Sequence, residues 1–244
     1  MSSNRKVVPT MTASDWPQAQ EVQETHQQLE AQGFALVFIT PGERNPMVKG
    51  WNTRHHPFEE YQQGQNLGIL PGALSGGLVC IDIDEPSLLS LADQYLPETG
   101  RVEGRAGKLR SHRYYRVTDL AEHEVAMPQV AGGIGGPRTR QFTDTYTGKR
   151  LVDLLGTGSC VVCPPSLHQS GERRVWDCEG DPAVVRYADL VQAVENLITA
   201  GGLTFKKTQA AMPACVEEIT AVDESKIPPM PERVERAQAY LAQM

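Results

Sequence analysis

Two aspartates, Asp82 and Asp84, interrupt the otherwise apolar run LVCIDIDEPS at 78–87. Successive side chains of a β-strand point to opposite faces, so the two carboxylates share one face of the predicted strand and the apolar residues between them line the other. Burying both carboxylates without a partner would cost several kcal/mol or force one of them to stay protonated. A metal ion, an arginine or bulk water must therefore compensate this pair.

Two further polar residues, His112 and Asp153, lie within predicted strands. Asp153 in RLVDLLG places its carboxylate on a face where a hydrophobic side chain would be expected. Each residue alone is more typical of a structural position than of a ligand. Together they suit one kind of site, because hard cations such as Mg²⁺ take oxygen ligands from a few carboxylates and from substrate phosphates, and two ions roughly 4 Å apart can clamp a phosphoryl transfer. Asp82, Asp84 and Asp153 would be the carboxylates.

A basic stretch, RVEGRAGKLRSHRYYR at 101–116, lies between these acids and contains one acid, Glu103. Its side chains would meet the triphosphate charge that metal ions leave uncompensated, through Arg105, Lys108, Arg110 and His112. A solvated β-hairpin would explain the same charges without any ligand, and the charges alone do not separate these two interpretations.

Composition places the chain among globular proteins. It has 244 residues, of which 40% are hydrophobic and 22% charged, enough for one large or two small domains. No apolar run approaches the roughly 18 residues of a membrane span, and the polar N-terminus lacks the apolar segment of a secretory signal. We therefore expect a cytoplasmic protein without a membrane partner. The formal net charge of −7 does not by itself indicate nucleic-acid binding, which usually requires a net basic surface.

The five cysteines are odd in number and scattered, which argues against a disulfide framework. Cys160 and Cys163 form a C-x-x-C motif in GSCVVCPP, but on the predicted buried strand their side chains face opposite ways and cannot grip one ion. The sequence has no second C-x-x-C to complete a zinc site. We therefore expect no metal role for these cysteines.

Hydrophobic patterning predicts a mixed α/β protein. Helices are expected at 14–32, with Ser14 as the N-cap, and at 87–96 and 188–198. Strands are expected at 34–39, 66–70, 77–84, 111–117, 150–156, 159–166 and 173–178. The segments 66–70 and 77–84 are expected to pair across the turn PGALSG, and the Gly-rich segment 131–142 to form a mobile loop.

Three regions follow from these patterns. The elements up to residue 205 form one predicted catalytic domain, 1–205. Residues 206–230 are polar and proline-containing without clear periodicity, which is typical of a linker. Residues 231–244 begin a new helix with Pro231 at its first position, which is typical either of the start of a further domain or of a short capping helix.

The sequence carries three ordered blocks, NLGILPGALSGGLVCIDID, GKLRSHRYYRV and LVDLLGTGSCVVCPPSLHQSGERRVW, preceded by PGERNPMVKGW. In this order they resemble the bifunctional DNA primase/polymerase (prim-pol) N-terminal domain of the archaeo-eukaryotic primase superfamily, which is common in phage and plasmid replication proteins. The resemblance covers roughly residues 33–176. It implies an α/β (α+β) fold with an RRM-like antiparallel catalytic sheet, flanking helices and a small N-terminal αβ lobe.

The resemblance also implies roles for individual residues. Its first motif matches Asp82 and Asp84, and its third matches Asp153, as ligands of two Mg²⁺ or Mn²⁺ ions. Its second motif, Ser-x-His, matches His112, which contacts the phosphates of the incoming nucleotide, although Arg110 stands at the serine position here. A further block, PPSLH, implies phosphate contacts from Ser166 and His168.

The activity implied is template-directed nucleotidyl transfer, in which a 3′-hydroxyl attacks the α-phosphate of an NTP or dNTP on a single-stranded DNA template. A helicase domain after residue 244 would be usual for such proteins. Three aromatic residues, Tyr114, Tyr115 and Trp51, are either stacking platforms for template bases or core residues.

Other functions fit part of the pattern. A metal-dependent nuclease or phosphohydrolase could use the same carboxylates to activate water, and a non-catalytic single-stranded nucleic-acid-binding module could keep the fold without the chemistry. A replication-initiator nickase needs a metal-binding His-x-His motif, which the sequence does not contain.

Overall fold

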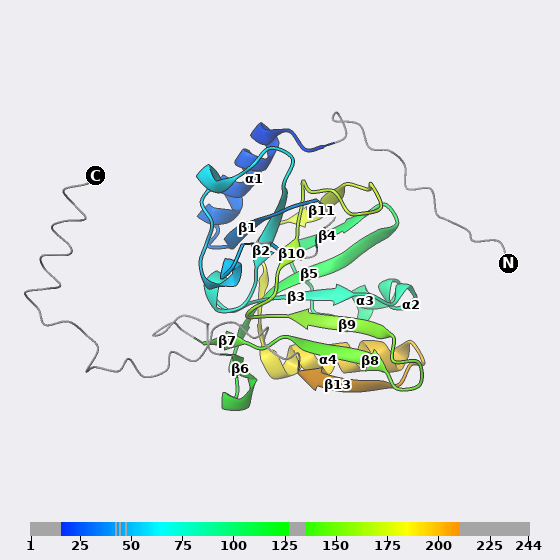
Figure 1. The fold of residues 1–244 in the computed structure, drawn as a ribbon. Coiled ribbons are helices and arrows are strands. Elements are labelled where there is room, and N and C mark those ends of the chain that lie inside the picture. The colour runs from blue at the N-terminus through cyan, green and yellow to red at the C-terminus, as the bar shows by residue number, and fades with distance from the viewer. Residues whose placement is uncertain (1–15, 42, 44, 47, 127–134, 210–244) are drawn as a thin grey trace, which may run out of the picture. The chain divides into compact units, whose positions relative to one another are not determined.

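The computed structural model of the protein describes residues 16–41, 43, 45–46, 48–126 and 135–209. An eight-stranded sheet forms the largest part of this fold, with strand order β11-β4-β5-β3-β9-β8-β13 and with β12 added to β5 (Figure 1). Its strands are β3 (Leu78–Ile83), β4 (Arg101–Arg105), β5 (Lys108–Thr118), β8 (Arg140–Asp144), β9 (Arg150–Leu155), β11 (Arg174–Glu179), β12 (Ala183–Arg186) and β13 (Phe205–Gln209). All neighbours pair antiparallel except β12 and β5, which pair in parallel.

A smaller sheet has the order β1-β2-β10, from β1 (Ala35–Ile39), β2 (Asn66–Leu70) and β10 (Val161–Val162). Helix α1 (Ala19–Ala31) packs against it through Val22 and Leu29. The N-terminal α-helix and strands thus lie together as expected, but the sheet is completed by a strand from much later in the chain. Short elements connect the rest: β6 (Val125–Ala126), β7 (Gly136–Pro137), and 3-10 turns at Trp51–Thr53, Phe58–Glu60, Ala73–Ser75 and Glu122–Glu124.

The large sheet buries one face against helix α4 (Tyr187–Ala200) and the short helices α2 (Pro86–Leu89) and α3 (Ala92–Tyr95). The apolar face of β3, formed by Val79, Ile81 and Ile83, lies in this core, as the alternation in the sequence predicts. The predicted α+β class is therefore confirmed, and the aspartates of β3 face the other side of the sheet.

A second core lies on that other side, between the two sheets. Leu78, Cys80 and Tyr114 of the large sheet pack there against Leu67 and Ile69 of the small sheet. Along the same face of β3, two buried apolar residues are thus followed by Asp82 at the point where the small sheet no longer covers the strand. This arrangement leaves the carboxylates at an open end between the two sheets.

Three expectations about the elements are wrong. The segments 66–70 and 77–84 do not pair as strands: β2 and β3 belong to different sheets, and only the isolated bridge Gly72–Leu78 joins this turn. The helix expected at 87–96 is divided into α2 and α3. The Gly-rich segment 131–142 contributes β7 and the start of β8, although residues 127–134 lie outside the described residues.

The boundary of the catalytic domain also needs correction. Residues expected to open a linker, from Lys206 to Gln209, belong to strand β13, which pairs with β8 along its length. The rest of the expected linker and the helix at 231–244 lie outside the described residues, as does Ser14. Among the residues that are described, no helix is long and apolar enough to cross a membrane.

Candidate active site

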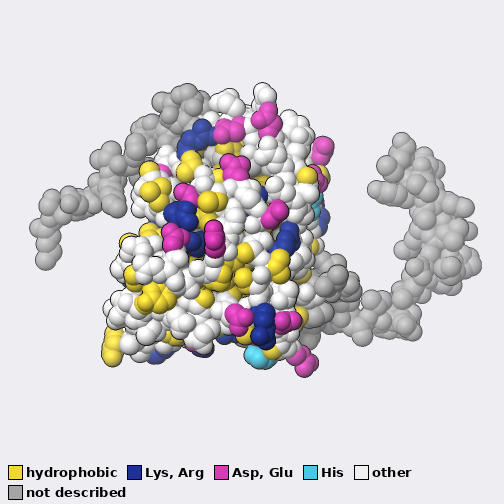
Figure 2. Space-filling view, turned by 180° about the vertical axis from the view of Figure 1, so that it is seen from behind, with side chains coloured by type: hydrophobic (Ala, Val, Ile, Leu, Met, Phe, Trp, Pro, Cys, Tyr) yellow, Lys and Arg dark blue, Asp and Glu magenta, His cyan; other side chains and the backbone are white. Residues whose placement is uncertain are grey.

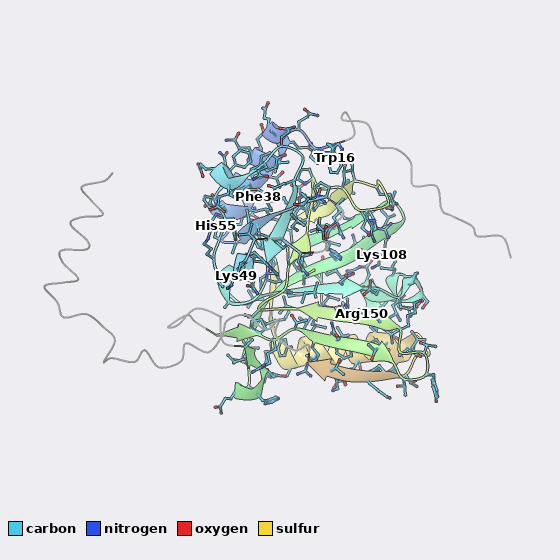
Figure 3. All side chains as sticks on the ribbon, in the orientation of Figure 1. Trp16, Phe38, Lys49, His55, Lys108 and Arg150 are labelled. Carbon is cyan, nitrogen blue, oxygen red and sulfur yellow. The ribbon has the colours of Figure 1, made fainter. Side chains whose placement is uncertain are left out.

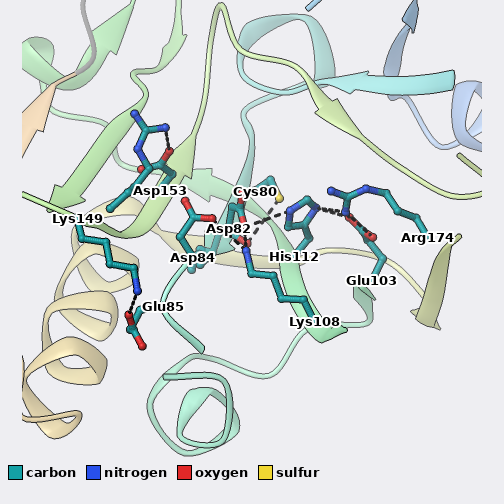
Figure 4. Close-up of polar contacts among 12 residues, drawn as sticks. Cys80, Asp82, Asp84, Glu85, Glu103, Lys108, His112, Lys149, Asp153 and Arg174 are labelled. Carbon is teal, nitrogen blue, oxygen red and sulfur yellow. Dashed lines mark hydrogen bonds and ion pairs between the residues drawn. The ribbon is translucent and has the colours of Figure 1, made fainter. Parts of the chain in front are cut away.

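The three sequence motifs meet in one row across the centre of the large sheet. Asp82 on β3 pairs in register with His112 on β5 and with Asp153 on β9. Residues directly opposite each other on neighbouring strands project from the same face, so all three side chains lie on the face that carries no helix (Figure 4). Residues separated by 71 positions in the sequence are adjacent only because β3 lies between β5 and β9.

Lysine is the nearest cation to the paired aspartates. Lys108 Nζ lies 3.1 Å from Asp82 Oδ1 and 3.1 Å from Asp84 Oδ1, and His112 Nε2 lies 3.2 Å from Asp82 Oδ1. Burial alone would raise the pKa of Asp82, yet His112 and Lys108 outweigh burial and hold this pKa well below its usual range. The side chains that compensate the two carboxylates are therefore a lysine and a histidine from the same strand, β5.

Asp153 lies in a different environment. Its side chain is only 4% exposed; Arg150 NH1 donates to Oδ2 at 2.9 Å, and Oδ1 is buried without a hydrogen-bond partner among the described residues. Burial, together with the charges of Asp84 and Asp82, raises the pKa of Asp153 to about 7 despite Arg150. Figure 3 labels Arg150 and Lys108, which come from the two strands that flank β3. Asp153 Oδ1 thus has an unused acceptor position.

His112 is held from behind by a buried ion pair. Glu103 on β4 is fully buried, forms an ion pair with His112 Nδ1, and accepts from Arg174 NH1 at 2.9 and 3.1 Å, while Arg174 NH1 also lies 3.1 Å from His112 Nδ1. Burial opposes charging of the imidazole, but Glu103 and Asp82 together raise the pKa of His112. The imidazole is thus fixed with Nδ1 toward Glu103 and Nε2 toward Asp82, where it can donate a hydrogen bond.

A cavity of about 460 Å³ opens above this row, between the two sheets. Asp82, Asp84, His112 and Arg174 line one part of it. Side chains that line another part are apolar and come mainly from the small sheet and the loop after it: Leu155, Val161, Val162 and Leu167. A charged end and an apolar end within one cavity suit a ligand that is itself divided, such as a nucleotide with its phosphates and base.

Of two other predicted phosphate contacts, His168 lines this cavity and Arg105 does not. Arg105 forms an ion pair with Glu172, which also accepts from the backbone of Gly107. His168 lines the cavity, and burial together with the charges of Arg105, Arg174 and Lys108 lowers its pKa. Three cations near this wall, Arg105, Arg174 and Lys108, would favour an anion there.

Arg110 and Ser166 do not face the cavity, and their predicted roles as nucleotide contacts need correction. A register shift in the β4–β5 pair and a φ of 54° at Arg110 break the alternation of β5, so this side chain turns to Asp93 of α3 and Asp177 instead. Ser166 is 1% exposed, and its hydroxyl accepts from Leu67 N at 2.8 Å and lies 3.0 Å from Leu67 O. It is a structural link to β2.

The aromatic candidates are packing residues. Tyr114 and Tyr115 are fully buried in the two cores, and the hydroxyl of Tyr115 donates to Pro97 O at 2.8 Å. Trp51 packs against the outer face of the small sheet. None of the three is a free platform for a base. Cys160 and Cys163 are reduced and their thiols have raised pKa values because of burial.

Sequence reasoning missed three residues of this site: Glu103, Arg174 and Arg150. Glu103 carried a signal, because it is the one acid in a basic hairpin. Arg174 alternates with apolar residues on β11, but its partner lies 71 residues away, and no local pattern identifies that pairing. Arg150 stands three residues before Asp153 on the same strand.

The carboxylates fit a hard divalent ion in kind, because they offer oxygen ligands and one of those oxygens lacks any partner. They do not form a ready-made site: within the described part of the chain, no three His, Cys, Asp or Glu side chains converge on one ion position. Lys108 and Arg150 hold the carboxylates in ion pairs instead.

Comparison with known families agrees with this geometry. The family described as bifunctional DNA primase/polymerase, N-terminal, matches residues 26–188, which is more than half of the chain and includes the whole row of motif residues. No curated protein matches the sequence.

Proposed function

The chain belongs to the bifunctional DNA primase/polymerase N-terminal family, and from this premise we propose that it is a nucleotidyltransferase that adds an NTP or dNTP to a 3′-hydroxyl on single-stranded DNA. The observation that carries the proposal is the in-register row of Asp153, Asp82 and His112, of which Asp82 and His112 line a cavity that has both charged and apolar side chains. We expect the activity to serve DNA replication of the phage or plasmid type.

The acidic residues would hold the metal ions. Proteins of this family generally use divalent metals, and Asp82, Asp84 and Asp153 supply the carboxylates for two Mg²⁺ or Mn²⁺ ions. Bound ions would stabilise the charge that develops on the transferred phosphoryl group and on the attacking 3′-oxygen. Because Asp153 has a pKa of about 7, it must release a proton before it can bind an ion with both oxygens.

The basic residues would hold the triphosphate. His112 donates from Nε2, while Arg174 supplies a fixed guanidinium beside it, and Glu103 keeps both side chains in place. Charge-assisted hydrogen bonds from these groups to phosphate oxygens are shorter and stronger than neutral ones. The apolar wall formed by Val161, Val162 and Leu167 would receive the base.

One face of the protein offers a DNA template no continuous positive charge. The face shown in Figure 2 has acidic and basic side chains interspersed, without a continuous basic surface. Single-stranded DNA binding requires cations that track the phosphates. We therefore expect the template to lie along the open side of the large sheet, near the β4–β5 hairpin with Arg105.

The test is incorporation of labelled NTP and dNTP on single-stranded DNA, with and without a primer, in Mg²⁺ or Mn²⁺. We expect Asp82→Asn to lower incorporation by about a hundredfold or more, because it removes a carboxylate that acts on the transition state. Asp119→Asn is the matched control, since Asp119 is exposed and pairs only with Arg186 at 3.2 Å among its described contacts.

Two outcomes would contradict the proposal. Retained DNA binding without any product, in wild-type protein and in every metal, would favour a non-catalytic binding module. Metal-dependent cleavage of DNA or of nucleotide, lost in Asp82→Asn and without synthesis, would favour a nuclease or phosphohydrolase.

A further inference from the structure

Lys108 occupies the space between the two aspartates of the first motif. Its Nζ is equidistant from Asp82 Oδ1 and Asp84 Oδ1, at 3.1 Å from each, and its side chain is 16% exposed (Figure 4). Lys108 is the first residue of β5 and follows the hairpin turn at Ala106 and Gly107. The ammonium is therefore carried by a long flexible stem at the end of a hairpin.

A divalent ion and the Lys108 ammonium cannot share these carboxylate oxygens. Both are cations that need the same ligands, and an ammonium has no lone pair with which to coordinate a metal. An ion that binds Asp82 and Asp84 through their Oδ1 atoms must therefore displace Nζ and separate the existing ion pairs. That separation weakens the affinity of the free site for the bare ion.

Two of the acids near this wall already have cationic partners. Glu172 is already paired with Arg105, and Glu103 with Arg174 and His112. The surrounding cations would repel the freed ammonium. A triphosphate in the cavity would supply the missing negative charge, because His112 and Arg174 line the same cavity as the aspartates.

We propose that Lys108 is an exchangeable counter-ion: it compensates Asp82 and Asp84 in the free protein, is displaced by the divalent ion, and transfers to the triphosphate that arrives with that ion. The inference rests on the proposed function, since it assigns the metal and triphosphate to this site. Its consequence is that the site takes the metal–nucleotide complex in preference to the bare ion.

The test measures Mn²⁺ binding without nucleotide, by electron paramagnetic resonance of the free ion. We expect Lys108→Met to bind Mn²⁺ about tenfold more tightly than wild type, because a partly exposed unit charge close to the ion is removed. Lys108→Arg keeps the charge and should bind Mn²⁺ as wild type does. The matched control is Lys149→Met, which removes a lysine paired at 2.7 Å with the neighbouring Glu85 and should change the affinity less than about twofold.

A second measurement, of the affinity for a nucleoside triphosphate, should change in the opposite direction to the affinity for Mn²⁺. In EDTA, Lys108→Met should bind a nucleoside triphosphate about tenfold more weakly than wild type, because Asp82 and Asp84 then lack their counter-ion and repel the triphosphate. A merely structural lysine would, on removal, weaken both ligands together or neither. Thermal unfolding in EDTA checks that the variant is folded, and Lys108→Gln replaces it if it is not.

The outcomes separate this inference from the proposed function. Mn²⁺ binding that Asp82→Asn abolishes, but that Lys108→Met fails to tighten, would overturn the counter-ion role and leave the metal site intact. Mn²⁺ binding that is indifferent to Asp82→Asn would overturn the metal site itself, and with it both proposals.

Discussion

Two adjacent arginines show how burial decides what an ion pair does. Arg173 binds Glu21 at 2.7 Å on the surface, while Arg174 binds Glu103 at 2.9 Å where the glutamate is fully buried. The exposed pair is hydrated and screened, and contributes little. The buried pair holds His112 in the orientation that the site needs, and Glu103 has no water as an alternative partner.

We expect Glu103→Gln to lower the free energy of unfolding by about 3 kcal/mol, because it leaves Arg174 as a buried charge with a weakened partner. The equivalent change at the surface, Glu21→Gln, should cost less than about 1 kcal/mol. Urea unfolding of both variants measures the difference. Equal costs for the two would show that the Glu103 pair is hydrated in solution.

The raised pKa of Asp153 predicts how stability depends on pH without metal. The unfolded carboxyl ionises near 3.8, whereas the folded one keeps its proton up to about 7. Between these values the folded state binds more protons than the unfolded state, so the free energy of unfolding falls as the pH rises.

Relative to Asp153→Asn, wild-type protein in EDTA should therefore lose about 2 kcal/mol of stability between pH 5 and pH 8. Denaturant unfolding at both pH values measures this. The free energy of unfolding of Asp119→Asn should change with pH as that of wild type does over the same range. If the free energy of unfolding of Asp153→Asn also changes with pH as that of wild type does, the Asp153 carboxyl is ionised at pH 5 and the inferred effect of burial on its pKa is wrong.

At the scale of elements, the central position of β3 creates the site and the strand β13 completes the sheet around it. The ring of Phe205 on β13 packs edge-on against the fully buried Phe142 of β8, with 5.5 Å between centroids. Phe142 lies opposite Val152 on β9, next to Asp153. The last described strand thus supports the strand that carries the third carboxylate.

We expect Phe205→Ala to destabilise the protein by about 2 kcal/mol, because a half-buried aromatic side chain and its partner lose their contact. Lys206→Ala on the same strand is exposed and should be near neutral. Thermal or urea unfolding compares the two. A neutral Phe205→Ala would mean that β13 adds nothing to the stability of the domain, as expected if a linker began at residue 206.

For the molecule as a whole, the cavity is built from two sheets with separate cores. The acids and His112 come from the large sheet, and much of the apolar wall comes from the small one. A ligand that fills the cavity contacts both sheets and binds only when both are folded. Its binding energy therefore adds to the stability of the fold.

A nucleoside triphosphate with Ca²⁺, at a hundred times its dissociation constant, should raise the free energy of unfolding by about 2.7 kcal/mol. The same ligand should give no shift in the double variant Asp82→Asn/Asp84→Asn. Denaturant unfolding with and without EDTA measures the effect of removing the metal. A ligand shift that survives in the double variant would place nucleotide binding elsewhere.

Local sequence patterns identified the candidate site residues and the face of the strand on which each side chain lies. Local alternation predicted the face shared by Asp82 and Asp84, the apolar face opposite and the helix at 188–198, because side-chain direction along a strand or helix is a property of neighbouring residues. The order of the motifs indicated the family.

Which of these residues contact one another depends on the tertiary fold. The ammonium of Lys108 lies between the two aspartates. A register shift turns the side chain of Arg110 away from the cavity, and Ser166 forms a hydrogen bond with Leu67, which lies 99 residues earlier in the chain. Strand β2 belongs to the small sheet, whereas β3, the next strand along the chain, belongs to the large sheet. These outcomes depend on strand order, register and burial, which arise from contacts between distant segments and leave no periodic signal in the sequence.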